Sequence, residues 1–236
     1  MSLAPSPTVF PTLSSFIGTQ TVVISNILIE LLIAFVGSIP ALLFAIWVDK
    51  QRMPKLEITA SEEANTDATY QQPNSHAGER WKFFRVKVKN KPFPRPFAWI
   101  PRQTAENCRA KIEFSKIGTE QSGFSMLGRW ASSPELPFIP ASEAFLRLLY
   151  PDPVTIPINE AENLDVITKN ENDKEAYGWN NEAYFNNWKT PKFKLDRGKY
   201  TVKISIATQN GVTFTEKFEL SISDKIENTY LKKGSK

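Results

Sequence analysis

The chain of 236 residues contains one cysteine and one histidine. A single cysteine excludes an internal disulfide framework and any metal site built from several cysteines. A single histidine excludes the histidine-rich zinc and iron sites and weakens every catalytic scheme that needs a histidine base. Ten glycines leave little material for phosphate-binding loops. We therefore expect neither a metal nor another cofactor, and we do not expect an enzyme.

Lysine and arginine are absent from the first 49 residues, so all 29 of them lie in the rest of the chain. Within the basic-free part, Leu31–Val48 is an uncharged and mainly apolar run of 18 residues, long enough to cross a bilayer as a helix. We predict a transmembrane helix over residues 21–48, behind an N-terminal tail of residues 1–20. One alternative is a buried core helix, although a helix apolar on all sides is rare in a domain of this size. The other is a cleaved signal peptide, which needs a basic start, a shorter apolar run and a small residue before the cut.

The charges beside this segment predict its orientation. Lys50, Arg52 and Lys55 follow it, and no basic residue precedes it. Positively charged flanks stay on the cytoplasmic side of a membrane. We expect an integral, single-pass protein of the plasma membrane with its N-terminus outside and its C-terminal domain in the cytoplasm.

Small residues recur every four positions in the predicted helix, at Gly37, Ala41 and Ala45. Such a face lets two helices pack closely, so these three residues form a candidate helix-packing face, although the pattern is also common by chance. Glu30 is the other polar feature of the segment. It either marks the outer boundary of the apolar run or is a functional carboxylate inside the membrane.

After the membrane segment and a polar stretch, apolar residues alternate with polar ones, which is typical of strands with one buried face. The clearest alternations begin at Phe84, Cys108 and Tyr200. Asn210 and Gly211 stand between two such runs and predict a β-hairpin. About seven to nine antiparallel strands with turn-rich connections favour an all-β, Ig-like sandwich.

The predicted sandwich spans residues 81–224. The other expected parts are a juxtamembrane segment (49–80) with a first strand near 54–59 and a polar linker, a basic C-terminal tail (225–236), a short helix near 142–150 and a turn near 181–187. The lone histidine lies in the polar linker, where we expect it to be exposed to solvent.

Five segments of the chain occur in an order that is typical of a known group of proteins. They are Val86–Asn90, Ala105–Ile112, Leu127–Trp130, Ile158–Val166 and Leu195–Val202. This order resembles that of small prokaryotic membrane-anchored proteins with one Ig-like, CARDB-type sandwich behind a single helix. The resemblance implies the fold and no catalytic residues, because members of that group mostly have no assigned activity. The chain departs from the group in a proline-rich loop at 91–102 and a long insertion near 168–192.

The insertion holds five aromatic residues and four asparagines between Tyr177 and Trp188. Aromatic faces stack on flat partners, and amides both donate and accept hydrogen bonds. The candidate ligand or partner loop consists of Tyr177, Trp179, Asn180, Asn181, Tyr184, Phe185, Asn187 and Trp188. Three interpretations stay open: a plug over one end of the sandwich, a docking site for a protein, and a site for a sugar or another ligand.

Arg85, Lys87 and Lys89 alternate along one predicted strand. Basic residues near an anionic inner leaflet gain about 1 kcal/mol each, so these three form a candidate lipid-contact stripe. The alternative is the solvated outer face of a strand. Nucleic acid is not expected as a partner, because the pI near 9.0 is mild and no aromatic pattern of an RNA-binding sheet is present.

Glu160, Glu162 and Asp165 are the best candidates for acid–base chemistry. Neither a glycine-rich loop nor a nucleophilic serine motif accompanies them, and a polar strand edge explains them equally well. Cys108 and Trp130 fall on inward-facing positions, where we expect them to pack in the core.

We therefore expect a non-enzymatic membrane protein that presents a β-sandwich interaction module at the membrane surface. The expected ligand is a protein partner or a second copy of the chain, and a small molecule is not expected. Two alternatives remain. One is an accessory or structural subunit of a larger membrane complex, and the other is an outward-facing module that binds carbohydrate or a surface layer.

Overall fold

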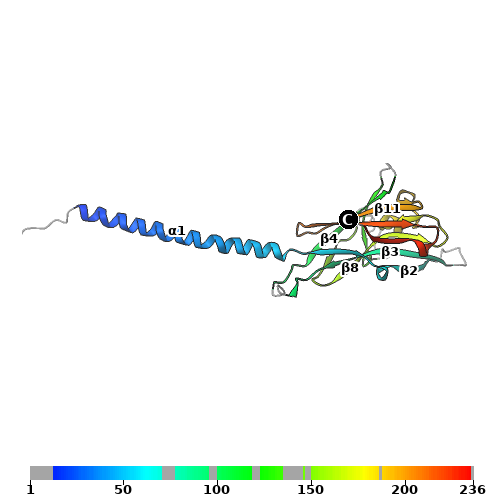
Figure 1. Cartoon of the computed structure of the whole chain (residues 1–236), viewed down its shortest axis with the longest axis horizontal. Helices are drawn as coiled ribbons and strands as arrows, with labels where there is room; N and C mark the ends of the chain where they lie inside the picture. Colours follow the sequence, from blue (N-terminus) through cyan, green and yellow to red (C-terminus); the bar gives the residue numbers. More distant parts are fainter. Residues whose placement is uncertain are drawn as a thin grey trace, which may run out of the picture. The chain divides into compact units, whose positions relative to one another are not determined.

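A computed structural model describes residues 13–70, 78–95, 100–118, 123–134, 146, 150–185 and 188–234 (Figure 1). For residues 13–28 and for residue 70 it describes the backbone alone. The chain falls into two compact units, a helical unit that ends at Gln51 and a second unit that begins at Arg52. All the strands of the described part belong to the second unit.

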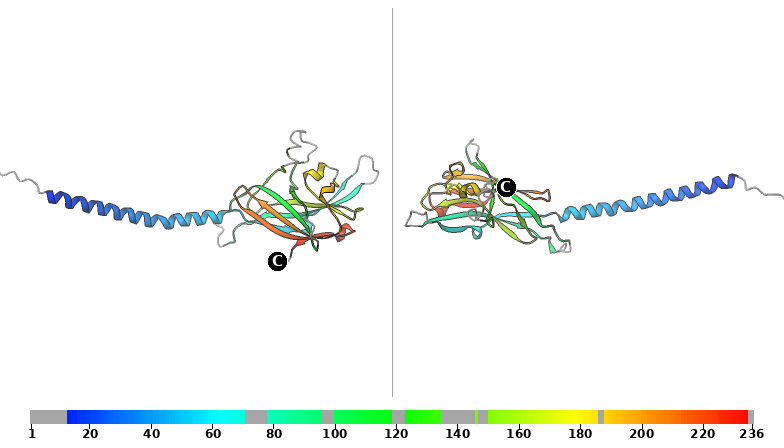
Figure 2. Two further views of the ribbon diagram at one scale, coloured as in Figure 1. Left: turned by 90° about the horizontal axis from the view of Figure 1, so that it is seen from above. Right: turned by 180° about the vertical axis from the view of Figure 1, so that it is seen from behind.

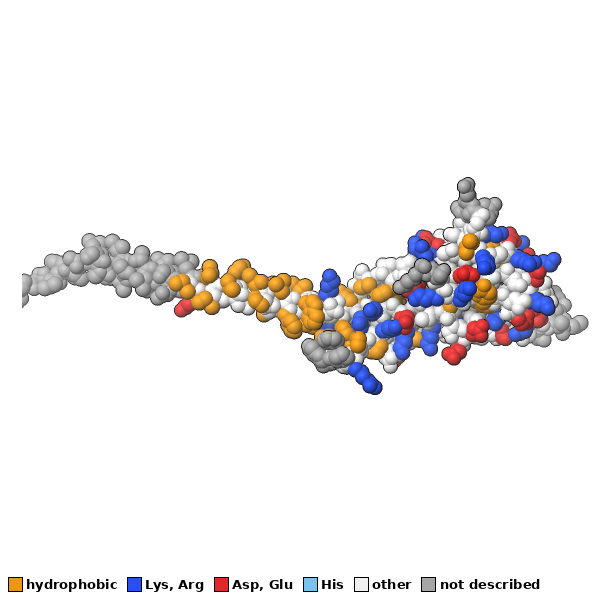
Figure 3. Space-filling view, viewed as in Figure 1, with side chains coloured by type: hydrophobic (Ala, Val, Ile, Leu, Met, Phe, Trp, Pro, Cys, Tyr) orange, Lys and Arg blue, Asp and Glu red, His pale blue; other side chains and the backbone are white. Residues whose placement is uncertain are grey.

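Helix α1 (Leu13–Arg52) contains the predicted transmembrane segment and begins before residue 21. Its part from Ile29 to Arg52 has a mean hydropathy of 2.5, and none of that apolar stretch is buried. Within the described residues it is the one helix that is long and apolar enough to cross a membrane. Hydrophobic side chains gather along it, whereas basic and acidic side chains are interspersed over the second unit (Figure 3). The helix ends where Pro54 follows, because a proline disfavours helical geometry in the residue before it.

Thirteen strands in the described part form two antiparallel sheets, which confirms the predicted all-β sandwich. The strands of the first sheet are β1 (Leu56–Ala60), β2 (Thr66–Tyr70), β3 (Glu79–Asn90), β6 (Arg129–Trp130), β8 (Ala161–Asn170), β9 (Ala176–Gly178) and β10 (Lys194–Leu195). Their order is β1-β3-β8-β9-β10, with β2 beside β3 and β6 beside β8. Figure 1 shows β2, β3 and β8 in this layer.

The strands of the second sheet are β4 (Ala105–Lys116), β5 (Ser125–Leu127), β7 (Val154–Ile156), β11 (Gly198–Ala207), β12 (Thr213–Ile222) and β13 (Tyr230–Lys233). Their order is β13-β12-β11-β4-β5, with β7 beside β4. The short helical elements of this unit are η1 (Glu62–Ala64), α3 (Asn181–Phe185), η4 (Pro191–Phe193) and η5 (Ile226–Asn228). Figure 2 shows the strands from two further sides, with α3 in yellow outside the strand layers.

The predicted hairpin joins β11 to β12. Gly211 has φ of +79°, a backbone conformation that glycine adopts without the strain of a Cβ atom. The N–H of Thr208 donates to the carbonyl of Val212, which closes the turn at 3.0 Å. From there the two strands pair without interruption from Ala207 opposite Thr213 to Gly198 opposite Ile222. The turn therefore sets the register of the longest hairpin in the described part of the second sheet.

The core lies between the sheets and follows the alternation in the sequence. Its fully or almost fully buried members from the first sheet are Ile58, Phe84, Val86, Val88, Trp130, Leu164, Val166 and Ile167. Those from the second sheet are Ala105, Cys108, Ile112, Phe114, Val202, Ile204, Ile206, Phe218 and Leu220. Burial of this apolar surface stabilises the sandwich by about 25 cal/mol for each Å² removed from water.

Trp130 connects the two sheets at the centre of the core. Its ring is 1% exposed, and its Nε1–H donates to the carbonyl of Cys108 at 3.1 Å. Cys108 is itself fully buried, and its Sγ lies 3.4 Å from the carbonyl oxygen of Ala105. Burial raises the pKa of the Cys108 thiol to about 11. Both residues therefore pack in the core, as their positions in the sequence predict.

The Cys108 thiol is expected to be unreactive in the folded protein. At pH 8 a thiol with a pKa of about 11 is ionised in roughly one molecule per thousand, and burial also keeps the reagent away. We expect Ellman's reagent to label less than one tenth of the protein within an hour, and all of it after unfolding in guanidinium chloride. Rapid labelling of the folded protein at one thiol per chain would contradict this placement.

Two segments expected to lie outside the sandwich contribute strands to it. The predicted linker contains β2, which pairs with β3 from Thr66 opposite Phe83 to Tyr70 opposite Glu79. The predicted tail contains β13, which pairs with β12. Both strands are polar because they lie at the periphery and bury little, so composition alone does not distinguish them from loops. The helix expected near 142–150 lies mostly outside the described residues, and the turn expected near 181–187 contains α3.

The buried amide of Asn90 fixes the start of the sandwich. Its Oδ1 accepts from the backbone N–H of Lys55 at 3.3 Å, and its Nδ2 donates to the carbonyls of Gln103 and Ile156 at 3.1 Å. The N–H of Lys91 donates to the carbonyl of Lys55 at 2.9 Å. The backbone just before β1 is thus part of the folded domain rather than of a free linker.

Candidate functional site

A cavity of about 230 Å³ lies on the first sheet, on the face that points away from the second sheet. The strands β2, β3, β6 and β8 contribute its floor, and the segment around α3 contributes its cover. The lining residues are Thr66, Ala68, Phe83, Arg85, Arg129, Ala131, Ser133, Asp165, Trp179, Tyr184 and Trp188. Three of them, Trp179, Tyr184 and Trp188, belong to the candidate loop predicted from the sequence.

A row of three charged side chains crosses the floor. The register places Asp165 of β8 opposite Arg85 of β3 on one side and opposite Arg129 of β6 on the other. Side chains of directly opposite residues leave a sheet on the same face, so the two guanidinium groups flank the carboxylate. The Nε–H of Arg85 donates to Oδ1 of Asp165 at 2.6 Å. The sheet therefore builds an Arg–Asp–Arg row from three segments that are far apart in the sequence.

The carboxylate of the row is almost completely shielded from water. Asp165 is 2% exposed and Arg129 is 5% exposed, whereas the side chain of Arg85 retains 19% of its exposure. Burial raises the pKa of Asp165, and the positive charges of Arg85 and Arg129 act in the opposite direction. Two guanidinium groups thus flank one shielded carboxylate on the floor of the cavity.

Arg129 is held in place by contacts on each side. Its Nη1–H donates to Oδ1 of Asn181 at 3.0 Å, and its Nη2–H donates to the carbonyl of Ser133 at 3.2 Å. Its guanidinium lies 5.4 Å from the centre of the Tyr184 ring, within cation–π range. The Nη1–H of Arg85 similarly donates to the hydroxyl of Thr66 at 2.6 Å. The guanidinium groups are therefore positioned before any ligand arrives.

Aromatic rings form the wall of the cavity. Trp179 lies 5.1 Å from Phe83 and 5.0 Å from Trp188, measured between ring centres, and both pairs meet edge to face. Trp188 also meets Phe83 at 5.5 Å and Trp81 at 5.2 Å. Edge-to-face pairs add about 0.5–1.5 kcal/mol each beyond the area they bury. This cluster holds the insertion against the sheet.

The local fold of the insertion gives Asn180 a structural role. Asn180 precedes α3, and its Oδ1 accepts from the N–H of Ala183 at 2.9 Å, as an N-capping residue does. After the helix, the N–H of Trp188 donates to the carbonyl of Ala183 at 3.0 Å. Trp188 has φ of +66°, a backbone conformation that residues other than glycine rarely adopt. The hydrogen bond to Ala183 and the ring contacts of Trp188 accompany this backbone conformation.

Ser133 supplies a polar group without a partner. The residue is 9% exposed, and its Oγ is buried with no hydrogen-bond partner among the described residues. Its backbone is fixed, because its N–H donates to the carbonyl of Trp130 at 3.0 Å and its carbonyl accepts from Arg129. A buried hydroxyl without a partner is costly, so an unpaired one that lines a cavity indicates a position for a ligand or for water.

The predicted loop residues divide into those that line the cavity and those that support it. Tyr177, Asn180 and Asn181 are buried and are not among the residues that line the cavity. Phe185 is exposed, and Asn187 lies outside the described residues. Sequence reasoning missed Phe83, Arg129 and Ser133, although the strand phase that Phe83 shares with Arg85 is a signal that could have placed it on the same face.

The three residues of the candidate lipid-contact stripe differ in their contacts and exposure. Arg85 is hydrogen-bonded to Asp165 and Thr66, whereas Lys87 is exposed and Lys89 is half-buried.

Two of the candidate acid–base residues lie on different faces of the sheet. Glu162 pairs with Val88 and Asp165 with Arg85, so these two carboxylates leave β8 on opposite faces. The candidate helix-packing face is exposed, and a Cβ atom added at Gly37 would meet nothing within 4 Å.

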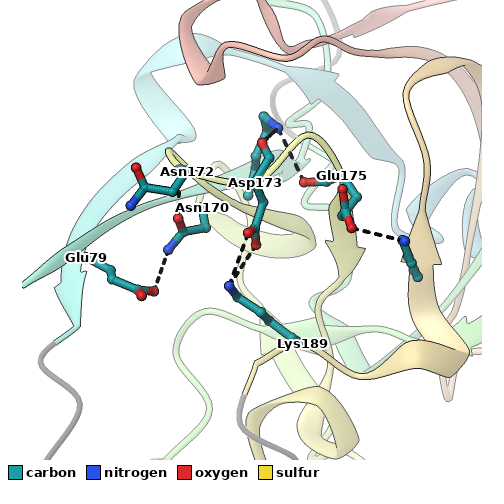
Figure 4. Close-up of polar contacts among 8 residues, drawn as sticks. Glu79, Asn170, Asn172, Asp173, Glu175 and Lys189 are labelled. Atoms are coloured by element: carbon teal, nitrogen blue, oxygen red, sulfur yellow. Dashed lines mark hydrogen bonds and ion pairs between the residues drawn. The ribbon is translucent and has the colours of Figure 1, made fainter. Parts of the chain in front are cut away.

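A second polar cluster braces the turn between β8 and β9 (Figure 4). Asn170 donates from Nδ2 to Glu79 at 2.7 Å, and Lys189 pairs with Asp173 at 2.9 Å. The ammonium group of the fully buried Lys169 donates to the backbone carbonyls of Asp173 and Glu175, and burial lowers the pKa of this lysine. These contacts stabilise the conformation of the turn. Across the described residues, no group of three or more metal-binding side chains occurs.

Comparison with known proteins adds no relative. No model of a protein family matches the chain, and neither a curated protein nor a solved structure is significantly similar to it. The resemblance to membrane-anchored Ig-like proteins therefore rests on the five sequence segments alone.

Proposed function

We propose that the chain is a single-pass membrane protein whose sandwich is a tethered, non-enzymatic binding module. The cavity on the first sheet carries this proposal. It combines fixed charged groups, an unpaired buried hydroxyl and an aromatic wall in one concave site. Binding sites typically combine an apolar lining with a few convergent polar groups in this way.

The position of the domain in the chain supports a role at the membrane surface. The apolar stretch of α1 ends at Arg52 and β1 starts at Leu56. The segment between them is hydrogen-bonded into the domain through Lys55 and Asn90. In the sequence, only residues 53–55 separate the end of this helix from the first strand. We place the module on the cytoplasmic side, because Lys50, Arg52 and Lys55 flank that end of the helix.

Protease protection tests the proposed orientation. A C-terminal epitope on the full chain is expected to survive protease in sealed right-side-out vesicles and to be digested after the vesicles are opened with detergent. A matched variant carries Lys50→Gln, Arg52→Gln and Lys55→Gln together with Thr19→Lys and Gln20→Lys, which reverses the charge bias. Its epitope is expected to become accessible in a large fraction of intact vesicles.

Digestion of the wild-type epitope in intact vesicles would overturn the cytoplasmic placement. The outward-facing module that binds carbohydrate or a surface layer would then be the better proposal. Release of the epitope-bearing fragment from the membrane without protease would show instead that α1 is cleaved as a signal sequence.

A second candidate function is that of an accessory subunit of a larger membrane complex. The exposed face of Gly37, Ala41 and Ala45, with open space at Gly37, favours it. Replacing the apolar stretch of α1 with an unrelated membrane helix separates the two functions. A tethered module keeps its ligand after the replacement, whereas a subunit that assembles through its helix loses its complex.

A further inference from the structure

We propose that the cavity on the first sheet binds a small organic carboxylate attached to a flat, apolar group. This inference rests on the proposed binding function and specifies the ligand. It differs from the expectation drawn from the sequence, which favoured a protein partner over a small molecule. Four observations carry it: the charge of the row, the free donors, the aromatic wall and the volume.

The guanidinium group of Arg85 favours a negative charge in the cavity. Its side chain retains 19% of its exposure, so it is the part of the row that meets the open side. A cation would be repelled there, because two guanidinium groups flank the single carboxylate of Asp165. A neutral ligand can accept a hydrogen bond from a guanidinium group, but it lacks the charge-assisted bond that a carboxylate forms.

The available donors fit the two oxygens of a carboxylate. Arg85 uses its Nε–H for Asp165 and its Nη1–H for Thr66, and no hydrogen bond from its Nη2 occurs within the described residues. The buried hydroxyl of Ser133 likewise has no partner there. A guanidinium group and a hydroxyl are both donors, and carboxylates accept from both with short, charge-assisted hydrogen bonds.

The wall and the volume fit an aromatic or similarly flat body. The rings of Phe83, Trp179 and Trp188 meet at 5.0–5.5 Å between centres and present apolar surface to the cavity. A cavity of roughly 150 Å³ accommodates benzene in a protein interior. The 230 Å³ present here therefore has room for a ring and a carboxylate, but not for an extended peptide.

The cavity is reachable from solvent. Thr66 at its rim is exposed, and Tyr184 and Trp188 are half-buried. Arg85 retains 19% of its side-chain exposure, so the ionic row meets the open side through this residue. A ligand can then enter with its carboxylate towards the row and its apolar body against the tryptophans.

Benzoate is the probe for the test, with benzamide as its neutral isostere and acetate as the carboxylate without a ring. The full chain in detergent micelles is labelled with 5-fluorotryptophan, and ¹⁹F spectra are assigned by single Trp→Phe variants. Benzoate is expected to shift the Trp179 and Trp188 signals in a saturable manner and to leave Trp47 of α1 unchanged. Benzamide and acetate are expected to bind at least tenfold more weakly, because benzamide lacks the negative charge and acetate lacks the ring.

Two variants and one control locate the binding. Ser133→Ala and Arg85→Lys are each expected to weaken benzoate binding by about tenfold, because each removes a donor to a charged acceptor. Lys87→Ala is the matched control. It removes a positive charge from the same face of β3 outside the cavity, and benzoate affinity is expected to stay within twofold of the wild type.

The outcomes separate the ligand class from the binding function. Equal binding of benzamide and benzoate, or unchanged affinity in Ser133→Ala and Arg85→Lys, overturns the carboxylate and leaves the cavity as a binding site. No shift of Trp179 or Trp188 with any of the three probes overturns the carboxylate proposal and removes the observation that carries the binding module. A shift of Trp47 alone shows partition into the micelle and counts against the proposal in the same way.

Discussion

Replacing Trp130 with alanine is expected to lower the free energy of unfolding of the sandwich by about 4 kcal/mol. The ring is 1% exposed and packs between the two sheets. Its removal leaves a large void, and it also deprives the carbonyl of Cys108 of its indole donor. Domains of this size have a total stability of about 5–15 kcal/mol, so the loss is a large share of it.

Urea titration of the full chain in micelles, followed by near-ultraviolet circular dichroism, measures this loss. The matched control is Phe185→Ala, because that ring is 49% exposed, and a loss below about 1 kcal/mol is expected there. Trp130→Phe keeps most of the volume and is expected to remain folded with a loss of about 2 kcal/mol. A Trp130→Ala protein as stable as Phe185→Ala would show that the indole does not occupy the core.

Removing the central carboxylate of the ionic row is expected to have the second largest effect. Asp165→Ala leaves Arg85 and Arg129, on the strands at either side of β8, with no carboxylate of β8 between them. Breaking a buried ion pair by deleting one partner costs about 3 kcal/mol or more. Asp165→Asn keeps an oxygen acceptor for the Nε–H of Arg85, so a smaller loss of about 1–2 kcal/mol is expected.

A double-mutant cycle distinguishes the row from general damage to β8. Arg85→Ala is expected to destabilise the wild-type protein by more than it destabilises Asp165→Ala, because in the second background it relieves repulsion with Arg129. Asp196→Ala is the surface control, since that side chain is 70% exposed, and less than about 1 kcal/mol is expected. Additive losses for Arg85→Ala and Asp165→Ala would mean that the two side chains do not interact.

The sequence predicted those parts of the fold that local signals specify. Gly211 after Asn210 marks the β11–β12 turn, because few other residues adopt positive φ at low cost. The alternation from Phe84 onward predicts which side of β3 is buried, since successive side chains point to opposite faces. The same periodicity missed β2 and β13, because short peripheral strands bury too little to leave an apolar pattern.

The site was less predictable, because it depends on register between distant strands. Arg85 and Asp165 each stood out, one as a lipid contact and the other as an acid–base group. Their pairing depends on a shift in the β3–β8 register between Phe84 and Arg85, and a change of one residue would move a side chain to the other face. Arg129 carried no signal of its own, since a lone arginine in a two-residue strand is indistinguishable from a surface residue. The aromatic insertion was recognised, but which rings line a cavity follows only from how it folds back.

The ends of the two sheets also bear on how the protein behaves when many copies share one membrane. In the described part of the chain the strands that end the sheets are short: β1 has five residues, β10 two, β5 three and β13 four. β13 in addition carries Lys232 and Lys233. Long, flat and uncharged edges invite strand-to-strand aggregation, whereas short edges and lysines oppose it. In the tethered arrangement proposed above, a domain confined to a surface meets its copies far more often than one in free solution, and these short, partly charged edges oppose continuous intermolecular sheets.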